Sequence, residues 1–249
     1  MSADTWNPTQ YERFAAERRQ PVDDLLGLLH PSNGGTAVDL GCGNGEITVD
    51  LHHHLGAART LGIDSSPAML AGVPVADGVT FELGDLTTWW APNEVDVVFA
   101  NASLQWCGDH EHLLGRLRDQ LAPGGQLAVQ VPTNFDHASH RVSQAMLPDG
   151  PPDPVEANVL RPERYAEVLH ELGFAEQHVR LQVYGHVLDS SADVVEWVKG
   201  TSLTRFKPVV ADFDAFVDEY RRRLLAELGD VRPYFYAFKR ILIWARLAG

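Results

Sequence analysis

Residues 36–46 read T-A-V-D-L-G-C-G-N-G-E, and this stretch decides the fold of the chain. A short apolar run with β-branched residues carries an acid, Asp39, near its end and leads into a turn rich in glycine. Residues 47–55 then read as a helix. A strand, a glycine turn and a helix in this order predict a nucleotide-binding crossover, because glycine lets the backbone turn sharply and leaves room for a ligand.

The spacing of the glycines narrows the class of ligand that this turn can bind. Gly41, Gly43 and Gly45 form a G-x-G-x-G pattern, with Asp39 two residues before the first of them. A dinucleotide fingerprint reads G-x-G-x-x-G, and a Walker loop needs a lysine that does not follow here. A carboxylate at the end of a strand is a poor neighbour for phosphate and suits a cationic amine. The alternative is a structural glycine turn after a buried strand.

Two further strands are predicted to end in acids. Residues 59–64 end at Asp64, about 20 residues after the glycine turn, where an acid can accept hydrogen bonds from both ribose hydroxyls. Ser66 and Pro67 then predict the start of a helix. Residues 79–83 are followed by Gly84 and Asp85. A helix cap or a solvated turn is the alternative for either acid alone.

The rest of the chain continues the strand and helix alternation. Residues 95–100 form an apolar run broken only by Asp96, as expected of a parallel strand covered on both faces. The loop from Asn101 follows its carboxyl end, the edge where open α/β sheets bind ligands. Further strands are predicted at 126–131, 177–187 and 236–246, helices at 111–121, 161–172, 192–199 and 212–228, and a loop or short helix within 132–154.

Composition excludes several functional classes. The chain has 249 residues, enough for one domain and a cap, and its net charge of −14 disfavours nonspecific nucleic-acid binding. No apolar run approaches the roughly 18 residues of a membrane span. Cys42 and Cys107 lack zinc-like spacing, and residues 52–54, three histidines, are expected to close a helix. We therefore expect a cytoplasmic protein, a monomer or homodimer, without metal, membrane or nucleic acid.

Several motifs together resemble a known family. D-L-G-C-G-N-G-E at 39–46 resembles motif I of class I S-adenosylmethionine (SAM) methyltransferases. W-N-P-T-Q-Y-E-R-F-A-A-E-R-R-Q-P at 6–21 resembles the opening of trans-aconitate methyltransferases, as do G-I-D-S-S-P-A-M at 62–69, N-A-S-L-Q-W at 101–106 and V-Q-V-P-T-N-F at 129–135. The chain is thus similar to the trans-aconitate methyltransferase family over nearly its whole length.

This resemblance implies a fold and a division into parts. The fold is α/β, a Rossmann-like, seven-stranded and mostly parallel sheet with helices on both faces, whose last strand returns antiparallel beside the sixth. Residues 1–30 are expected to form an N-terminal lid, and residues 31–190 with 234–249 the SAM-binding domain. Residues 191–233 are expected to form a helical substrate cap.

The implied activity is methyl transfer from SAM to a carboxylate oxygen of a small carboxylic acid such as trans-aconitate. A carboxylate is already ionised at neutral pH, so we assign no catalytic base and expect catalysis from alignment and exclusion of water. Two alternatives stay open. One is a secondary-metabolite methyltransferase acting on another oxygen or nitrogen nucleophile, with His137 or His140 as base. The other is a SAM-binding protein without turnover.

The resemblance also implies the site. SAM contacts are expected on the glycine loop and on the ends of the next three strands, at Asp39, Gly41, Cys42, Gly43, Gly45, Asp64, Ser65, Met69, Asp85, Leu86, Asn101, Ala102 and Ser103. Substrate contacts are expected on the lid, on the loops after the fourth and fifth strands and on the last strand, at Tyr11, Arg18, Gln105, Trp106, Asn134 and Arg240. Gln20 stands where the family carries an arginine, which leaves the acceptor open.

Overall fold

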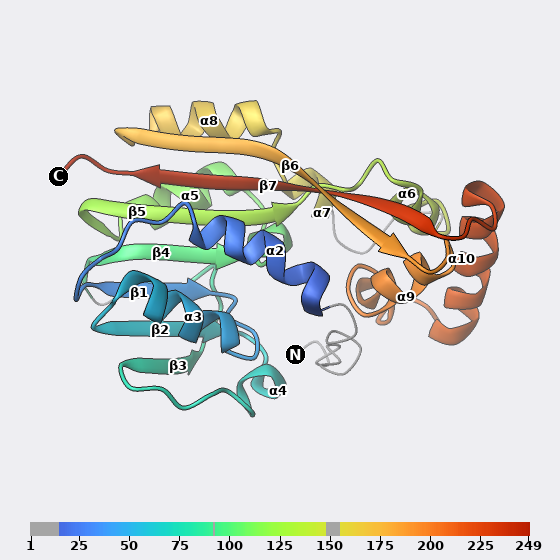
Figure 1. Ribbon diagram of the computed structural model, residues 1–249, viewed down its shortest axis with the longest axis horizontal. Helices are drawn as coiled ribbons and strands as arrows, with labels where there is room; N and C mark the ends of the chain where they lie inside the picture. The colour runs from blue at the N-terminus through green and yellow to red at the C-terminus, as the bar shows by residue number, and fades with distance from the viewer. Residues whose placement is uncertain (1–14, 92, 148–154) are drawn as a thin grey trace. The chain divides into compact units, whose positions relative to one another are not determined.

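The computed structural model describes residues 15–91, 93–147 and 155–249, with side chains described from residue 19 onward. Seven strands form one sheet in the order β3-β2-β1-β4-β5-β7-β6 (Figure 1). The strands are β1 (Thr36–Leu40), β2 (Arg59–Asp64), β3 (Val79–Leu83), β4 (Val95–Asn101), β5 (Leu121–Pro132), β6 (Glu176–Leu188) and β7 (Tyr234–Arg246). The α-helices are α2 (Ala15–Leu26), α3 (Glu46–Leu55), α4 (Pro67–Leu70), α5 (His110–Arg118), α6 (Ala138–Gln144), α7 (Val155–Asn158), α8 (Pro162–Glu171), α9 (Asp193–Lys199) and α10 (Phe213–Leu228). Two 3-10 helices are η1 (Leu104–Trp106) and η2 (Thr204–Phe206).

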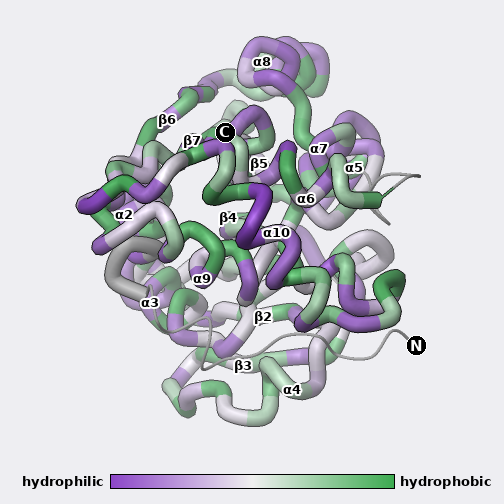
Figure 2. The backbone as a smooth tube through the Cα atoms, turned by 90° about the vertical axis from the view of Figure 1, so that its right-hand side faces the viewer, coloured by the Kyte–Doolittle hydropathy of each residue, from purple (hydrophilic) through white to green (hydrophobic). Residues whose placement is uncertain are grey.

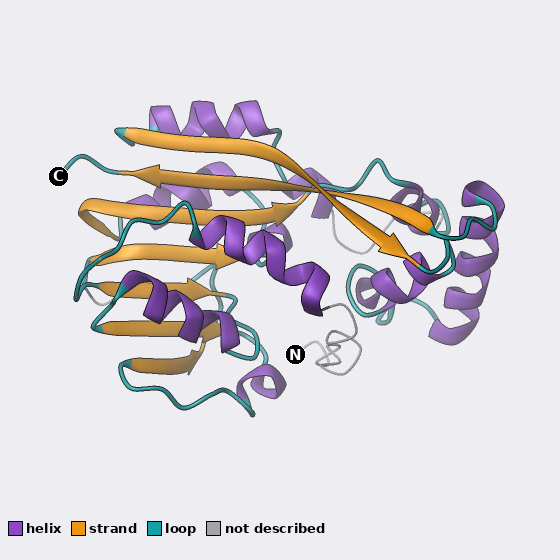
Figure 3. Cartoon of the chain, viewed as in Figure 1, coloured by secondary structure: helices purple, strands orange, loops and turns teal. Residues whose placement is uncertain are grey.

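The sheet has the predicted mixed topology. Strand β1 pairs parallel with β2 and β4, β2 pairs parallel with β3, and β4 pairs parallel with β5. Strand β7 pairs antiparallel with β5 and lies between β5 and β6. Figure 3 shows the strands of this sheet with helices between them along the chain. The predicted α/β fold class is confirmed.

The chain divides into two compact units. The sheet unit comprises Arg19–Pro132, Ala157–Gln182 and Arg240–Gly249. The helical unit comprises Thr133–Glu156 and Val183–Lys239, together with residues 15–18. Strands β6 and β7 contribute residues to both units. The division into lid, binding domain and cap stays a prediction.

The apolar core of the sheet unit lies on one face of the sheet. Alternate residues of the central strands, among them Val98 and Val129, pack there with the apolar sides of α5 and α8. Helix α8 buries Tyr165 and Leu169 and keeps polar residues outside, so its coils carry both hydrophobic and hydrophilic colours in Figure 2. On the opposite face lie α2 and α3 (Figure 1). Both faces of the central strands are therefore covered, as their continuous apolar runs predict.

Helix boundaries on the sheet unit follow local chemistry. Helix α3 begins after Gly45 and ends before Gly56, both in the left-handed region, and the three histidines occupy its last turn as predicted. Helix α4 begins with the predicted cap, since Ser66 Oγ accepts from Met69 N at 3.2 Å and Pro67 takes the first helical position. These caps therefore fix the direction in which the chain leaves β1 and β2.

The prediction of a helix over 111–121 is wrong at its carboxyl end. Helix α5 stops at Arg118, and β5 already begins at Leu121. Val95 pairs with Leu121 whereas Val97 pairs with Gln126, so the P-G-G segment at 123–125 belongs to an irregularity within the strand. Gly124 adopts a φ of 74° there. A bulge of this kind depends on pairing with a distant strand, which local turn chemistry does not reveal.

The helical unit has its own core. Aromatic side chains of α9, α10 and β7, including Trp197, Tyr220 and Tyr236, are buried together. Ser139 at the start of α6 binds this cluster, because its Oγ lies 3.1 Å from Tyr236 Oη and its carbonyl accepts from Tyr220 Oη at 2.8 Å. In the described parts of the chain, no helix combines the length and the apolar character needed to cross a bilayer.

Candidate functional site

The glycine loop after β1 depends on backbone conformations that other residues avoid. Gly41, Gly43 and Gly45 have φ values of 77°, 57° and 80°. A Cβ on Gly41 would lie 2.3 Å from Ser103 Cβ, so the loop packs directly on the segment after β4. At Gly43 the nearest described atom to such a Cβ is Met69 Cε, at 3.7 Å. The loop therefore has no room for a side chain at Gly41 but has room for ligand atoms at Gly43.

Asp39 is buried beneath this loop. It is 2% exposed, and its Oδ2 accepts a hydrogen bond of 2.7 Å from Thr48 Oγ1 of α3. Burial raises the pKa of Asp39 to about 7, against the lowering effect of the Thr48 bond. Burial also raises the pKa of the Cys42 thiol, with Asp39 as the next cause. An ionised Asp39 gains stability from a cation nearby, because burial penalises its isolated charge.

Asp64 ties the glycine loop to the start of α4. Its Oδ2 accepts from Gly43 N at 2.9 Å, and its Oδ1 accepts from Ser66 N at 2.8 Å. Each carboxylate oxygen can accept a further bond, and Asp64 is only half-buried. Ser65 beside it is exposed, and Met69 is half-buried against the loop. Asp64 is therefore oriented by the protein and still available to a ligand.

Asp85 and Leu86 lie at the neighbouring strand end. Asp64 pairs with Leu83 across β2 and β3, so the two acids occupy the same edge of the sheet. Asp85 is exposed, and its Oδ1 accepts from the backbone and hydroxyl of Thr87 at 2.8 and 2.6 Å. Leu86 packs against the main core. The structure brings the predicted residues of β1, β2 and β3 together at one edge.

The loop after β4 contributes buried polar atoms to the same edge. Ser103 Oγ donates to Leu40 O at 2.6 Å, and Gln105 Nε2 donates to Ala102 O at 2.6 Å. Ala102 has a φ of 53°. Asn101 Oδ1 and Gln105 Oε1 are buried without a hydrogen-bond partner in the part of the chain that the structure describes. Such unpaired acceptors are costly, and they mark this loop as a place for a ligand.

The strand pair β5 and β7 adds a cation. Arg240 is 8% exposed, and its Nη1 donates to Gln130 Oε1 at 3.1 Å. Gln130 was not among the residues predicted from the sequence, although its amide interrupts the otherwise apolar run A-V-Q-V at 128–131. Trp106, also expected at the substrate, is the last residue of η1 and is 38% exposed.

Other predicted residues lie elsewhere. Asn134 belongs to the helical unit, where its Oδ1 accepts from Lys239 N at 3.2 Å. Tyr11 lies outside the described residues, as does the side chain of Arg18, whose backbone belongs to α2. His140, weighed as a base, is in the helical unit, and burial lowers its pKa to about 4. It is therefore neutral at pH 7.

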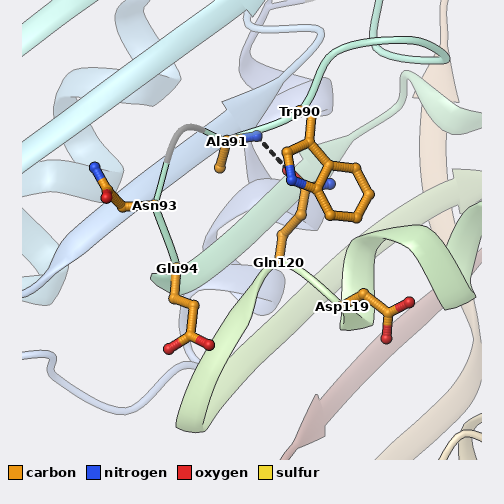
Figure 4. Close-up of a pocket in the computed structure, with 6 residues that line it drawn as sticks. All are labelled: Trp90, Ala91, Asn93, Glu94, Asp119 and Gln120. Atoms are coloured by element: carbon orange, nitrogen blue, oxygen red, sulfur yellow. Dashed lines mark hydrogen bonds between the residues drawn. The ribbon is translucent and has the colours of Figure 1, made fainter.

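A hollow of about 620 Å³ lies at the opposite edge of the sheet, before β4 and β5 begin (Figure 4). Its described lining includes the acids Glu94 and Asp119 and the exposed Trp90. Its neighbour Trp89 packs against the core, whereas Trp90 is 52% exposed. Ligands of open α/β sheets bind at the carboxyl ends of strands, so this hollow is not the candidate site. No group of three possible metal ligands occurs among the described residues.

Comparison with known proteins identifies the family. Residues 37–125 match the methyltransferase domain family. The trans-aconitate 2-methyltransferase of Deinococcus radiodurans is 40% identical over 97% of this chain and 98% of its own. That of Escherichia coli O157:H7 is 35% identical over 97% and 98%.

Solved structures agree at the level of fold. Phosphoethanolamine N-methyltransferase 2 of Haemonchus contortus, in complex with SAM, aligns with a TM-score of 0.62 at 18% identity, over 92% of this chain and 53% of that one. YcgJ of Bacillus subtilis aligns with a TM-score of 0.61 at 12% identity, over 93% and 99%. Together with the full-length relatives, the glycine loop and the strand-end acids lead to one conclusion: this chain belongs to the trans-aconitate 2-methyltransferase family.

Proposed function

We propose that this protein is a SAM-dependent methyltransferase that forms a methyl ester on a carboxylate of trans-aconitate. The supporting observation is the charge distribution along one sheet edge, with Asp39 and Asp64 in the last residues of β1 and β2, Asp85 just after β3, and Arg240 on β7. A cationic methyl donor fits the acidic part of this edge, and an anionic acceptor fits the guanidinium.

The residues present fit SAM. Its methionyl part would contact the glycine loop at Asp39, Gly41, Cys42, Gly43 and Gly45. Its ribose would bind Asp64, beside Ser65 and Met69, and its adenine would bind Asp85 and Leu86. Asn101, Ala102 and Ser103 would border its sulfonium, where the buried Asn101 Oδ1 offers an acceptor. Bound SAM supplies a methyl group on a positively charged sulfur.

The protein's own contribution is binding and orientation. An acceptor carboxylate needs no proton removed at pH 7, which agrees with a site to which we assign no catalytic base. Arg240, Gln105 and Trp106 are the proposed acceptor contacts of the sheet unit. Asn134, Tyr11 and Arg18 remain candidates from the rest of the chain. Fixing the attacking oxygen against the methyl group can lower the barrier by about 7–11 kcal/mol.

The activity is tested by release of S-adenosylhomocysteine from SAM in the presence of trans-aconitate, cis-aconitate, citrate, benzoate, a primary amine and a phenol. Turnover is expected with trans-aconitate and a methyl ester in the product. Turnover only on an amine or phenol would refute the proposal and favour the secondary-metabolite alternative, whereas SAM binding without turnover would favour the binding protein. Family membership favours the acid. The cytoplasm, and a monomer or homodimer, are part of the same proposal, and sedimentation of the purified protein measures the latter.

A further inference from the structure

Four polar side chains share one face of the sheet at its carboxyl edge. Asp39 pairs with Phe99 across β1 and β4, and Asn101 lies two residues further along β4, on the same face. Asn101 pairs with Gln130 across β4 and β5. Arg240 pairs with Pro132, two residues beyond Gln130. Because paired residues on neighbouring strands point to the same side, an acid, two amides and a guanidinium follow one another across four strands.

A second glutamine on the same face of β5 shows what a structural amide does. Gln126 Nε2 donates to His30 O at 2.9 Å, and its Oε1 accepts from His30 N at 2.9 Å and from Trp244 Nε1 at 3.0 Å. Both ends of this amide are satisfied, and it joins the chain after α2 to β5 and β7. Gln126 is 5% exposed, so burial alone does not distinguish it from Gln130.

Gln130 is satisfied at one end only. It is fully buried, and its Nε2 has no hydrogen-bond partner among the described residues. Its orientation is fixed by chemistry, because the guanidinium of Arg240 can only donate and so must face the amide oxygen. The amino group is thereby left as a buried donor without an acceptor. On the adjacent strand, about 4.8 Å away, Asn101 presents the complementary case, a buried acceptor without a donor.

We infer that Gln130 is a specificity-determining residue that donates a hydrogen bond from Nε2 to a carboxylate of the acceptor, while its Oε1 holds Arg240 in place for the same anion. This inference rests on the proposed function. The change from acceptor at Asn101 to donor at Gln130 marks the boundary between the site of the cationic methyl donor and the site of the anionic acceptor. The Gln130 amino group therefore favours an acceptor whose attacking oxygen carries no proton.

Two substitutions separate this role from a structural one. Gln130→Glu keeps the shape of the side chain and strengthens the bond to Arg240, but it replaces the donor with an anionic oxygen. Gln130→Met removes the donor without adding charge and also removes the acceptor that Gln130 Oε1 offers to Arg240 Nη1. A structural role predicts that Gln130→Glu keeps more activity than Gln130→Met. The specificity role predicts that Gln130→Met keeps the higher kcat/KM for trans-aconitate.

We expect kcat/KM for trans-aconitate to fall about tenfold in Gln130→Met and about a hundredfold in Gln130→Glu, with the larger part in KM. The Kd of SAM, measured by calorimetry, is expected to stay within about threefold of the wild type, since a tenfold change would require about 1.4 kcal/mol. Gln126→Met is the matched control, from the same strand, face and residue type. It is expected to lower the melting temperature and leave KM for the acid unchanged.

The possible failures are distinguishable. If the wild type does not methylate trans-aconitate, the proposed function is wrong. If the wild type is active but Gln130→Glu matches it or exceeds Gln130→Met in kcat/KM, the inference about Gln130 is wrong and Nε2 meets only water. A parallel loss of SAM affinity in both Gln130 variants would also overturn it, because the amide would then act on the methyl-donor side.

Discussion

Three glycines in left-handed conformations allow strain, packing and ligand contact to be separated by single Gly→Ala substitutions. Gly34, Gly41 and Gly43 have φ values of 96°, 77° and 57°, so alanine is strained at each by about 1–2 kcal/mol. Their surroundings differ. A Cβ on Gly34 meets no described atom within 4 Å, and one on Gly43 meets only Met69 Cε at 3.7 Å. A Cβ on Gly41 meets Ser103 Cβ at 2.3 Å.

The magnitudes follow from these contacts. Ser103 cannot move away easily, because its Oγ donates to Leu40 O at 2.6 Å. Crowding adds about 1–3 kcal/mol to the strain, so Gly41→Ala is expected to lower the free energy of unfolding by about 2–5 kcal/mol. Gly34→Ala and Gly43→Ala are expected to lower it by about 1–2 kcal/mol each. Only Gly43→Ala among these two places a methyl group in the proposed SAM site, and we expect its Kd for SAM to rise about tenfold to a hundredfold.

Urea unfolding measures the free energy of unfolding, and calorimetry measures the Kd for SAM. Gly34→Ala is the control, since it carries the strain without the ligand and is expected to bind SAM as the wild type does. The reasoning would be refuted if Gly43→Ala bound SAM with unchanged affinity, or if Gly41→Ala were no less stable than Gly34→Ala. The first result would remove the open side of the loop from the site, and the second would mean that the loop does not pack on the segment after β4.

Three further predictions concern charged residues. Asp64→Ala should raise the Kd of SAM about a hundredfold, through two lost charge-assisted bonds of about 1.5 kcal/mol each, whereas Asp77→Ala, an exposed acid before β3, should not; equal affinities in calorimetry would exclude Asp64 from the site. Arg240→Lys should raise KM for trans-aconitate about tenfold, since lysine keeps the charge but loses the planar fork, and an unchanged KM in steady-state kinetics would count against the guanidinium as anion site. Because burial raises the pKa of Asp39 to about 7, the folded state holds its proton more tightly than the unfolded state, and stability that is present below pH 4 is lost as the pH rises to 7. In urea unfolding, the free energy of unfolding of Asp39→Asn relative to the wild type should therefore rise by up to about 4 kcal/mol between pH 4 and 7. A constant difference would show that Asp39 titrates normally.

The parts of the fold that were predictable from sequence are those set by local chemistry. The turn at Gly41–Gly45 and the cap at Ser66 need particular residue types at fixed offsets, so the sequence shows them directly. The start of β5 could not be read in this way. Proline and two glycines at 123–125 resemble a stop signal, but Leu121 is held in the sheet by Val95, whose position depends on the whole fold.

The same limit applies to the two glutamines of β5. Both interrupt apolar runs, both are buried, and both point to the same face of the strand. Their difference comes from His30, Trp244 and Arg240, which are brought to β5 by segments far away in the chain. A sequence pattern can therefore indicate that a polar residue is unusual at such a position, but only the partners in the folded chain show whether its hydrogen bonds are complete.

Incomplete hydrogen bonding in the interior has an energetic meaning. A buried donor or acceptor without a partner costs about 1–3 kcal/mol, and a stable protein gains by replacing it with an apolar residue unless something else binds there. Among the described residues, Asn101, Gln105 and Gln130 carry such atoms at the sheet edge that also holds Asp39, a carboxylate whose pKa is raised by burial. Under the proposed function, bound ligands would reverse several of these costs, with a cation beside Asp39, a donor at Asn101 and an anion at Gln130. If the proposed function is right, the same groups that destabilise the free protein also set the order in which a cationic methyl donor and an anionic acceptor would lie along the sheet.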